Sequence, residues 1–125
     1  MSEMLLTDAL GQHLKTIAER DLTGFEKTIV PDGRLRVILP NGRILQGHDE
    51  VMAFHKNWFS DPDWSMVVER QESWATADMG YVLCQVTYND LDEEGQPYAL
   101  RYWLTLTFVY EHGQWLLIHD QNTLF

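Results

Sequence analysis

The sequence predicts an α+β fold in which helices come first and a long, mostly antiparallel sheet follows. Before residue 60, apolar residues recur at helical spacing in two stretches. From Trp64 onward, polar and apolar residues alternate with a period of two, and short turn signals divide this stretch. Helices that precede an antiparallel meander pack on one face of the sheet. With 125 residues, we expect one domain over 1–125.

The first half of the chain predicts three helices and a small hairpin. The first helix is expected over 4–19, and its apolar stripe consists of Leu6, Ala9, Leu10, Leu14 and Ile17, with His13 in phase. Asp21 or Thr23 caps a short second helix through Phe25 to Ile29. Two strands, over 34–39 and 43–46, flank an Asn-Gly turn. Asp49 caps a third helix, whose apolar side carries Val51, Phe54, His55, Trp58 and Phe59.

Four strands are expected in the second half, over 64–76, 79–90, 98–111 and 114–124. The last turn, His112–Gly113, pairs Tyr110 with Trp115, and paired residues share a face. One face, directed at the helices, then contains Tyr102, Leu104, Leu106, Phe108, Leu117, His119, Gln121 and Thr123. The outer face contains Trp103, Thr105, Thr107, Val109, Leu116, Ile118, Asp120 and Asn122. A turn with Gly95 in the left-handed region directs Val82, Cys84, Val86 and Tyr88 to the core. Arg70 and Glu72 interrupt the core phase of the first long strand. Either the strand bulges there and turns both side chains to solvent, which the pattern favours, or the two side chains reach the mouth of the pocket.

Charge and missing motifs exclude several function classes. The chain has 19 acidic and 9 basic residues, a net charge of −10, and so we expect neither nucleic acid nor anionic membrane as a partner. The single Cys84 cannot form an intrachain disulfide, and no secretory leader or long apolar run is present, which predicts a cytoplasmic protein. Nucleotide-binding loops, serine-hydrolase motifs and zinc-protease motifs do not occur, and we expect no cofactor.

Three histidines, His13, His55 and His119, fall in one predicted layer between helices and sheet. Each by itself is more often an ordinary buried histidine, but together with Tyr88, Tyr102 and Gln121 they exceed what an apolar core needs. We therefore predict a pocket for a small molecule, with His119 or His55 as proton carrier and Tyr102 orienting a carbonyl. The further lining residues are His13, Trp58, Tyr88, Gln121 and Thr123. The three histidines could instead hold a metal, but their spacing matches no ligand pattern, and we predict none. Asp120 is a weak candidate because its parity places it on the outer face.

The outer face of the predicted sheet carries a strip that is more apolar than a solvated surface. Its members are Trp103, Thr105, Thr107, Ile118 and Asn122, with Leu116 beside them. Strips of this kind are commonly covered by another subunit. We expect a homodimer through this face.

Three stretches of the chain, 40–51, 77–82 and 113–123, resemble the nuclear transport factor 2-like superfamily, which includes ketosteroid isomerases and SnoaL-like polyketide cyclases. The ending is most similar to the SnoaL-like subgroup related to the association domain of calcium/calmodulin-dependent protein kinase II. In that subgroup a Trp is followed at even spacing by two histidines and a Ser. Here His119 matches the first histidine, while Gln121 and Thr123 replace the second histidine and the Ser.

The resemblance implies a cystatin-like cone, with N-terminal helices packed on the concave face of a curved sheet, an internal pocket and a dimer through the sheets. It does not select an activity, because one fold hosts many functions. Two functions remain open. The first is a protein with a small-molecule pocket, either a binder or an acid–base enzyme of the isomerase, cyclase or dehydratase type, acting on a compact apolar substrate. The second is a non-catalytic dimerising or ligand-sensing module.

Overall fold

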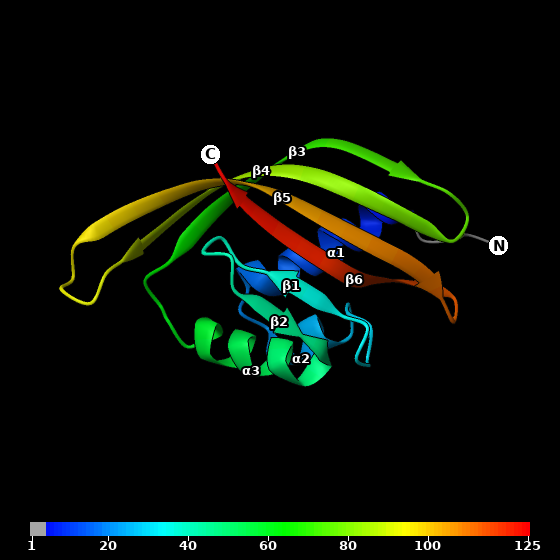
Figure 1. Ribbon diagram of the computed structural model, residues 1–125, viewed down its shortest axis with the longest axis horizontal. Coiled ribbons are helices and arrows are strands. Elements are labelled where there is room, and N and C mark those ends of the chain that lie inside the picture. Colours follow the sequence, from blue (N-terminus) through cyan, green and yellow to red (C-terminus); the bar gives the residue numbers. More distant parts are fainter. Residues whose placement is uncertain (1–4) are drawn as a thin grey trace.

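A curved six-stranded sheet arches over three helices, which lie on its concave side (Figure 1). This computed structural model describes residues 5–125. The helices are α1 (Leu6–Ala18), α2 (Leu22–Glu26) and α3 (Gly47–Phe59). The strands are β1 (Arg36–Ile38), β2 (Ile44–Gln46), β3 (Ser65–Ala75), β4 (Met79–Leu91), β5 (Pro97–Glu111) and β6 (Gln114–Leu124). Their order is β2-β1-β6-β5-β4-β3, and all neighbours are antiparallel except β1 and β6. The predicted α+β class is confirmed.

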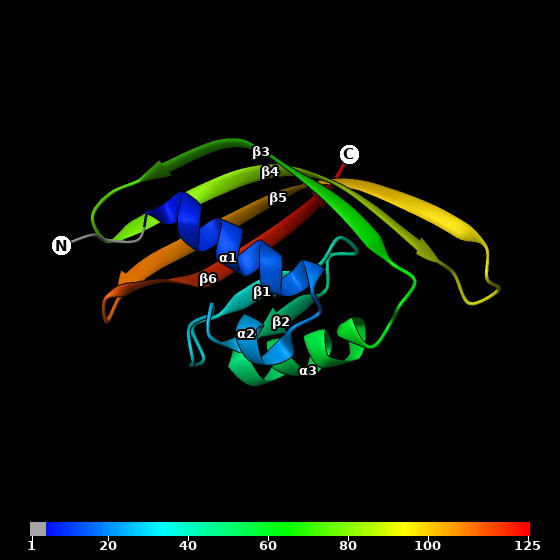
Figure 2. The same cartoon turned by 180° about the vertical axis from the view of Figure 1, so that it is seen from behind.

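The helices differ from the prediction only at their ends. The expected start of α1 at Met4 lies outside the described residues. Of the two predicted caps of α2, the structure uses Asp21, whose carboxylate accepts the Gly24 N–H at 3.0 Å, and the helix ends at Glu26 instead of the predicted Ile29. α3 begins at Gly47, whose φ of +87° suits glycine, and so Asp49 lies in the first turn instead of at the cap. Seen from behind, α1 lies along the concave face of the sheet (Figure 2).

The long hairpins follow the predicted register at their turns. Tyr110 pairs with Trp115 around a turn in which His112 and Gly113 both have positive φ. Gly95 is in the left-handed region, and Val82, Cys84 and Val86 are fully buried. β3 bulges between Arg70 and Glu72, as predicted, and both side chains are exposed.

β6 departs from the prediction after its first few residues. Phe108 pairs with Leu117, but Thr107 pairs with His119, so Ile118 is an extra residue in a β-bulge. Because side chains alternate with a period of two, one extra residue exchanges the two faces. His119, Gln121 and Thr123 now pair with the convex-face residues Thr107, Thr105 and Trp103. Asp120 and Asn122 pair with Leu106 and Leu104 on the concave face. The predicted faces of His119, Gln121, Thr123, Asp120 and Asn122 are therefore wrong.

The bulge lies where β6 changes its neighbour at the other edge. Before the bulge, Leu117 exchanges backbone hydrogen bonds with the loop after α2, accepting from Val30 N–H at 2.9 Å and donating to Thr28 O at 2.8 Å. After the bulge, His119 is level with Arg36 in the parallel ladder with β1. The extra residue joins these two pairings within one strand.

Candidate functional site

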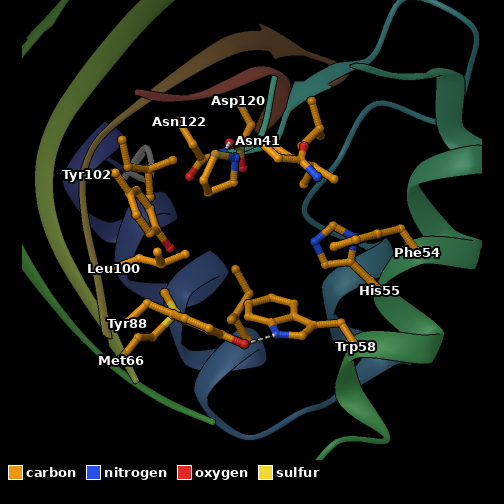
Figure 3. A pocket seen from close by; sticks show the side chains of 15 residues that line it. Asn41, Phe54, His55, Trp58, Met66, Tyr88, Leu100, Tyr102, Asp120 and Asn122 are labelled. Atoms are coloured by element: carbon orange, nitrogen blue, oxygen red, sulfur yellow. Dashed lines mark hydrogen bonds between the residues drawn. The ribbon is translucent and has the colours of Figure 1, made fainter. Parts of the chain in front are cut away.

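A cavity of about 280 Å³ lies between the concave face of the sheet, α3 and the turn that joins β1 to β2 (Figure 3). Its walls are mostly apolar, and they include Val37, Phe54, Trp58, Met66, Leu100 and Leu104. The polar side chains in the lining are Asn41, His55, Tyr88, Tyr102, Asp120 and Asn122. A mostly apolar cavity with a few convergent polar groups is the usual form of a small-molecule site.

Asp120 is the one lining residue with a carboxyl group. Burial raises its pKa to about 7, although a hydrogen bond from Asn122 opposes this shift. Asn122 Nδ2 donates to Asp120 Oδ1 at 2.9 Å and to the Ile38 carbonyl at 2.7 Å, which ties the carboxyl group to β1. Near neutral pH, Asp120 is therefore divided between its acid and base forms.

Tyr102 presents a hydroxyl group to the same cavity (Figure 3). The residue is only 7% exposed. Burial raises the pKa of its phenol, and the charge of nearby Asp120 raises it further, so the hydroxyl group keeps its proton at neutral pH. Among residues 5–125, no side chain or backbone group forms a hydrogen bond with this hydroxyl group, and it is free to donate to a bound molecule.

His55 faces the cavity from α3, across from Tyr102 and Asn122 (Figure 3). Its Nδ1 lies 2.7 Å from the Val51 carbonyl, which can only accept, so Nδ1 carries the proton. Burial lowers its pKa to about 4, and the imidazole is neutral at neutral pH. Phe25 stacks on the ring at 4.1 Å between centroids, and this fixes its plane.

Trp58 and Tyr88 close one end of the cavity. Trp58 Nε1 donates to the Tyr88 hydroxyl at 3.0 Å, and that hydroxyl donates to Asp90 at 2.9 Å. Trp58 also stacks on Trp64, with 4.4 Å between the ring centroids. Because the Tyr88 hydroxyl group accepts from Trp58 and donates its proton to Asp90, it has no proton left to donate to a ligand. Trp58 and Tyr88 therefore form a rigid wall of the cavity.

Four predicted pocket residues, His55, Trp58, Tyr88 and Tyr102, line the cavity, and the others do not. His119, Gln121 and Thr123 lie on the convex face because of the bulge at Ile118. For the same reason, the predicted outer-face position of Asp120 and the predicted interface position of Asn122 are wrong, and both residues line the cavity. The run Leu116–Leu117–Ile118 is the sequence feature that could have indicated the bulge. Three apolar residues in succession break the alternation that fixes a register.

His13 is a buried structural residue instead of a lining one. Its Nδ1 lies 2.7 Å from the Thr28 hydroxyl, which itself donates to the Phe25 carbonyl. Nδ1 must then be the donor to Thr28. Burial, and to a lesser degree the charge of His55, lowers the pKa of His13 to about 3. The three predicted histidines thus do not converge, and residues 5–125 contain no cluster of three or more side chains suited to hold a metal ion.

Burial raises the pKa of the Cys84 thiol to about 11, which removes it as a nucleophile near neutral pH. No helix in residues 5–125 is long and apolar enough to cross a membrane.

Comparison with known proteins gives one family match and many structural matches. The family model described as "SnoaL-like domain" matches residues 6–122. No curated protein matches the sequence. A solved structure from Thiobacillus denitrificans, named as a calcium/calmodulin-dependent protein kinase type II association domain, is similar with a TM-score of 0.81 and 15% identity. That match covers 100% of this chain and 98% of the other.

Two further similar structures carry names from enzyme classes. A ketosteroid isomerase-like protein from Erwinia carotovora atroseptica has a TM-score of 0.79 and 17% identity, over 95% of this chain and 92% of its own. A structure from Streptomyces avermitilis, named as a dehydratase of the NTF2-like family, has a TM-score of 0.79 and 13% identity, over 94% and 91%. These identities support the fold alone. A similar structure from Caulobacter vibrioides is described as having a cystatin-like fold. This chain has the same fold, as the family resemblance in its sequence implied.

Proposed function

The chain belongs to the SnoaL-like domain family, and from this premise we propose that it is an acid–base enzyme that moves a proton on a compact, mostly apolar carbonyl compound. One observation carries the proposal. The carboxyl group of Asp120, with a pKa near 7, shares an apolar cavity with the protonated hydroxyl group of Tyr102. The names of two similar structures, an isomerase-like protein and a dehydratase, fall in the same class of chemistry.

In the proposed reaction, the Asp120 carboxylate removes a proton from the carbon next to the substrate carbonyl. The electron pair of the broken C–H bond forms the C=C bond of an enolate, and the carbonyl oxygen gains the negative charge. Tyr102 donates a hydrogen bond to that oxygen. Where the substrate has a C=C bond between its β and γ carbons, the enolate extends over that bond as a dienolate. Asp120, now protonated, returns the proton to the γ carbon, so the double bond moves into conjugation with the carbonyl and the enzyme ends unchanged.

The environment of each group suits its role. A general base works best when its pKa lies near the operating pH, and burial brings Asp120 to that value. Tyr102 is fixed on β5 and needs no reorganisation when charge develops on the oxygen. Asn122 is a positioning residue, since its amide group donates one hydrogen bond to Asp120 Oδ1 and one to the Ile38 carbonyl, which leaves Asp120 Oδ2 for the substrate.

The test uses a β,γ-unsaturated cyclohexenone, whose isomerisation to the conjugated ketone is followed by ultraviolet absorbance. We expect the wild-type protein to accelerate this reaction, with a rate that rises with pH through about 7 as Asp120 ionises. Asp120→Asn should lower the rate about 100-fold or more, as expected for loss of a general base. Tyr102→Phe should lower it by about 100-fold, as for loss of one oxyanion donor.

His119→Gln is the matched control, because His119 is next to Asp120 in β6 but on the convex face. It should leave the rate unchanged. Binding of the ketone is measured in parallel by calorimetry or by quenching of the tryptophan fluorescence, to which Trp58 in the cavity wall contributes. A wild-type protein that binds the ketone without accelerating its isomerisation would contradict the proposal, and would favour a ligand-sensing module with the same fold.

A further inference from the structure

The unprotonated ring nitrogen of His55 is the strongest unused group in the cavity. Nδ1 is committed to the Val51 carbonyl, so Nε2 carries a lone pair and can only accept. Within residues 5–125, every fully buried side-chain nitrogen or oxygen has a hydrogen-bond partner, and no protein group is a partner of His55 Nε2. Since His55 is only 5% exposed and lines the cavity, Nε2 is reached from the cavity itself.

The His55 ring cannot turn away from the cavity. Phe25 stacks on one face, and Phe54, Trp58 and Phe59 contact the ring edge-on, with centroids 5.3–5.7 Å away. The bond from Nδ1 to the backbone of its own helix adds a further restraint. A buried acceptor held this firmly loses stability unless water or a ligand donates to it.

The charges around the cavity limit which ligands can donate a hydrogen bond to His55 Nε2. The cavity lining contains no Lys or Arg, and its one ionisable carboxyl group, Asp120, opposes a bound anion. The whole chain has a net charge of −10. An anionic ligand would lose its hydration without gaining a counter-charge, whereas an uncharged polar group would lose little.

We propose that the substrate is an uncharged molecule with a carbonyl at one end, directed at Tyr102, and a hydroxyl or N–H group at the other, which donates to His55 Nε2. His55 is then a specificity-determining residue. This inference rests on the proposed function for the carbonyl end, while the hydroxyl end rests on the geometry of His55 alone.

The test compares three uncharged probes of similar shape, acetophenone, para-hydroxyacetophenone and para-methoxyacetophenone, at about pH 6, where the phenol keeps its proton. Binding to the full chain is measured by calorimetry or by tryptophan fluorescence. One neutral hydrogen bond corresponds to about a 2- to 12-fold gain in affinity, so the hydroxylated probe should bind tighter than acetophenone by a factor in this range. The methoxy probe, which cannot donate, should show no gain.

Two variants assign the effect to Nε2. His55→Phe keeps the aromatic stacking but has no acceptor, and it should abolish the preference for the hydroxylated probe. His55→Gln restores an acceptor and should recover part of it. Equal affinities for all three probes in the wild-type protein, or no measurable binding of any of them, would overturn the inference, as would a preference that persists in folded His55→Phe.

The outcomes of the two experiments are separable. If the hydroxyl preference is absent but Asp120→Asn still abolishes isomerisation, the inference fails and the proposed function stands. If the preference depends on His55 but no isomerisation occurs, the recognition of an uncharged hydroxylated ligand stands without the catalysis. If His55→Phe does not fold, the three-probe series on the wild-type protein alone decides.

Discussion

At the scale of single residues, Asp120 occupies a position in the cavity wall at which an apolar side chain would give a more stable protein. Its pKa near 7 means that the folded protein resists ionising it, whereas the unfolded chain ionises it near 4. The native state therefore loses stability when the carboxyl group must be charged. A carboxyl group that destabilises the fold is more readily explained by a role in chemistry than by packing.

The raised pKa of Asp120 predicts how the free energy of unfolding changes with pH. The unfolded chain releases the Asp120 proton from about pH 4 upward, and the folded protein only near 7. The stabilising effect of the neutral form is thus complete below about pH 4 and is lost as pH rises to about 7. Asp120→Asn removes this dependence but keeps an oxygen for Asn122. We expect the variant to gain roughly 1–2 kcal/mol over wild type between pH 4 and 7, after a discount for water in the cavity.

Urea unfolding of both proteins at several pH values measures this difference. The buried histidines His13 and His55, whose lowered pKa values reduce stability below about pH 6.5, are present in both proteins and cancel in the comparison. Parallel curves for wild type and Asp120→Asn across this range would show that Asp120 is not a buried neutral acid.

Half of the predicted pocket residues, four of eight, line the cavity, and these four could be predicted from the local pattern of the sequence. His55 and Trp58 follow from the helical phase of α3, and Tyr88 and Tyr102 from the alternation in β4 and β5. Asp120 could not be assigned in this way, because its side depends on whether one residue earlier in β6 is paired or bulged. Alternation specifies a face only as far as the first bulge.

At the scale of elements, the residues in the turns explain why the register of the long strands could be predicted. The β4–β5 and β5–β6 hairpins each have a short loop with a glycine in the left-handed region, Gly95 and Gly113 respectively, which sets the pairing next to the turn. The bulge in β3 was signalled by the charges of Arg70 and Glu72 in the core phase. The bulge in β6 had no such charge, because Leu116, Leu117 and Ile118 are acceptable on either face.

The packing of α1 on the sheet depends on Gly80 in β4. A Cβ at this position would lie 2.6 Å from Leu6 Cδ2, 2.8 Å from Ala75 Cβ and 2.8 Å from the Trp74 carbonyl oxygen. Gly80→Ala should therefore destabilise the protein by about 1–3 kcal/mol, as overpacking does. Gly11→Ala in α1 is the control, since no atom lies within 4 Å of its added Cβ, and it should stabilise by about 0.5–1 kcal/mol. Thermal unfolding compares them, and equal stabilities would refute this account of the helix–sheet contact.

At the scale of the whole molecule, the helices cover only the concave face of the sheet, and the convex face remains open to solvent in the described chain (Figures 1 and 2). The bulge in β6 changes the composition of the convex face from the predicted one: Asp120 and Asn122 leave it, and His119, Gln121 and Thr123 join it. Trp103 is 37% exposed and packs on Phe125, and Trp74, farther along the sheet, is 59% exposed. Two large exposed aromatic side chains on one sheet face favour a covering partner.

A second copy of the chain is the partner that we predict for this face, with Trp103, Thr105, Thr107 and Ile118 at the contact. Trp103 lies in a central strand between Gln85 and Thr123, so a charge there would be desolvated in the middle of the interface. Light scattering or sedimentation should report about twice 14.6 kDa for the wild-type protein at micromolar concentration. Trp103→Glu should weaken the dimer by more than about 100-fold, equivalent to about 3 kcal/mol, whereas Ile44→Glu on the exposed edge strand β2 should leave it intact. A wild-type protein that stays monomeric under these conditions would show that solvent alone covers the convex face.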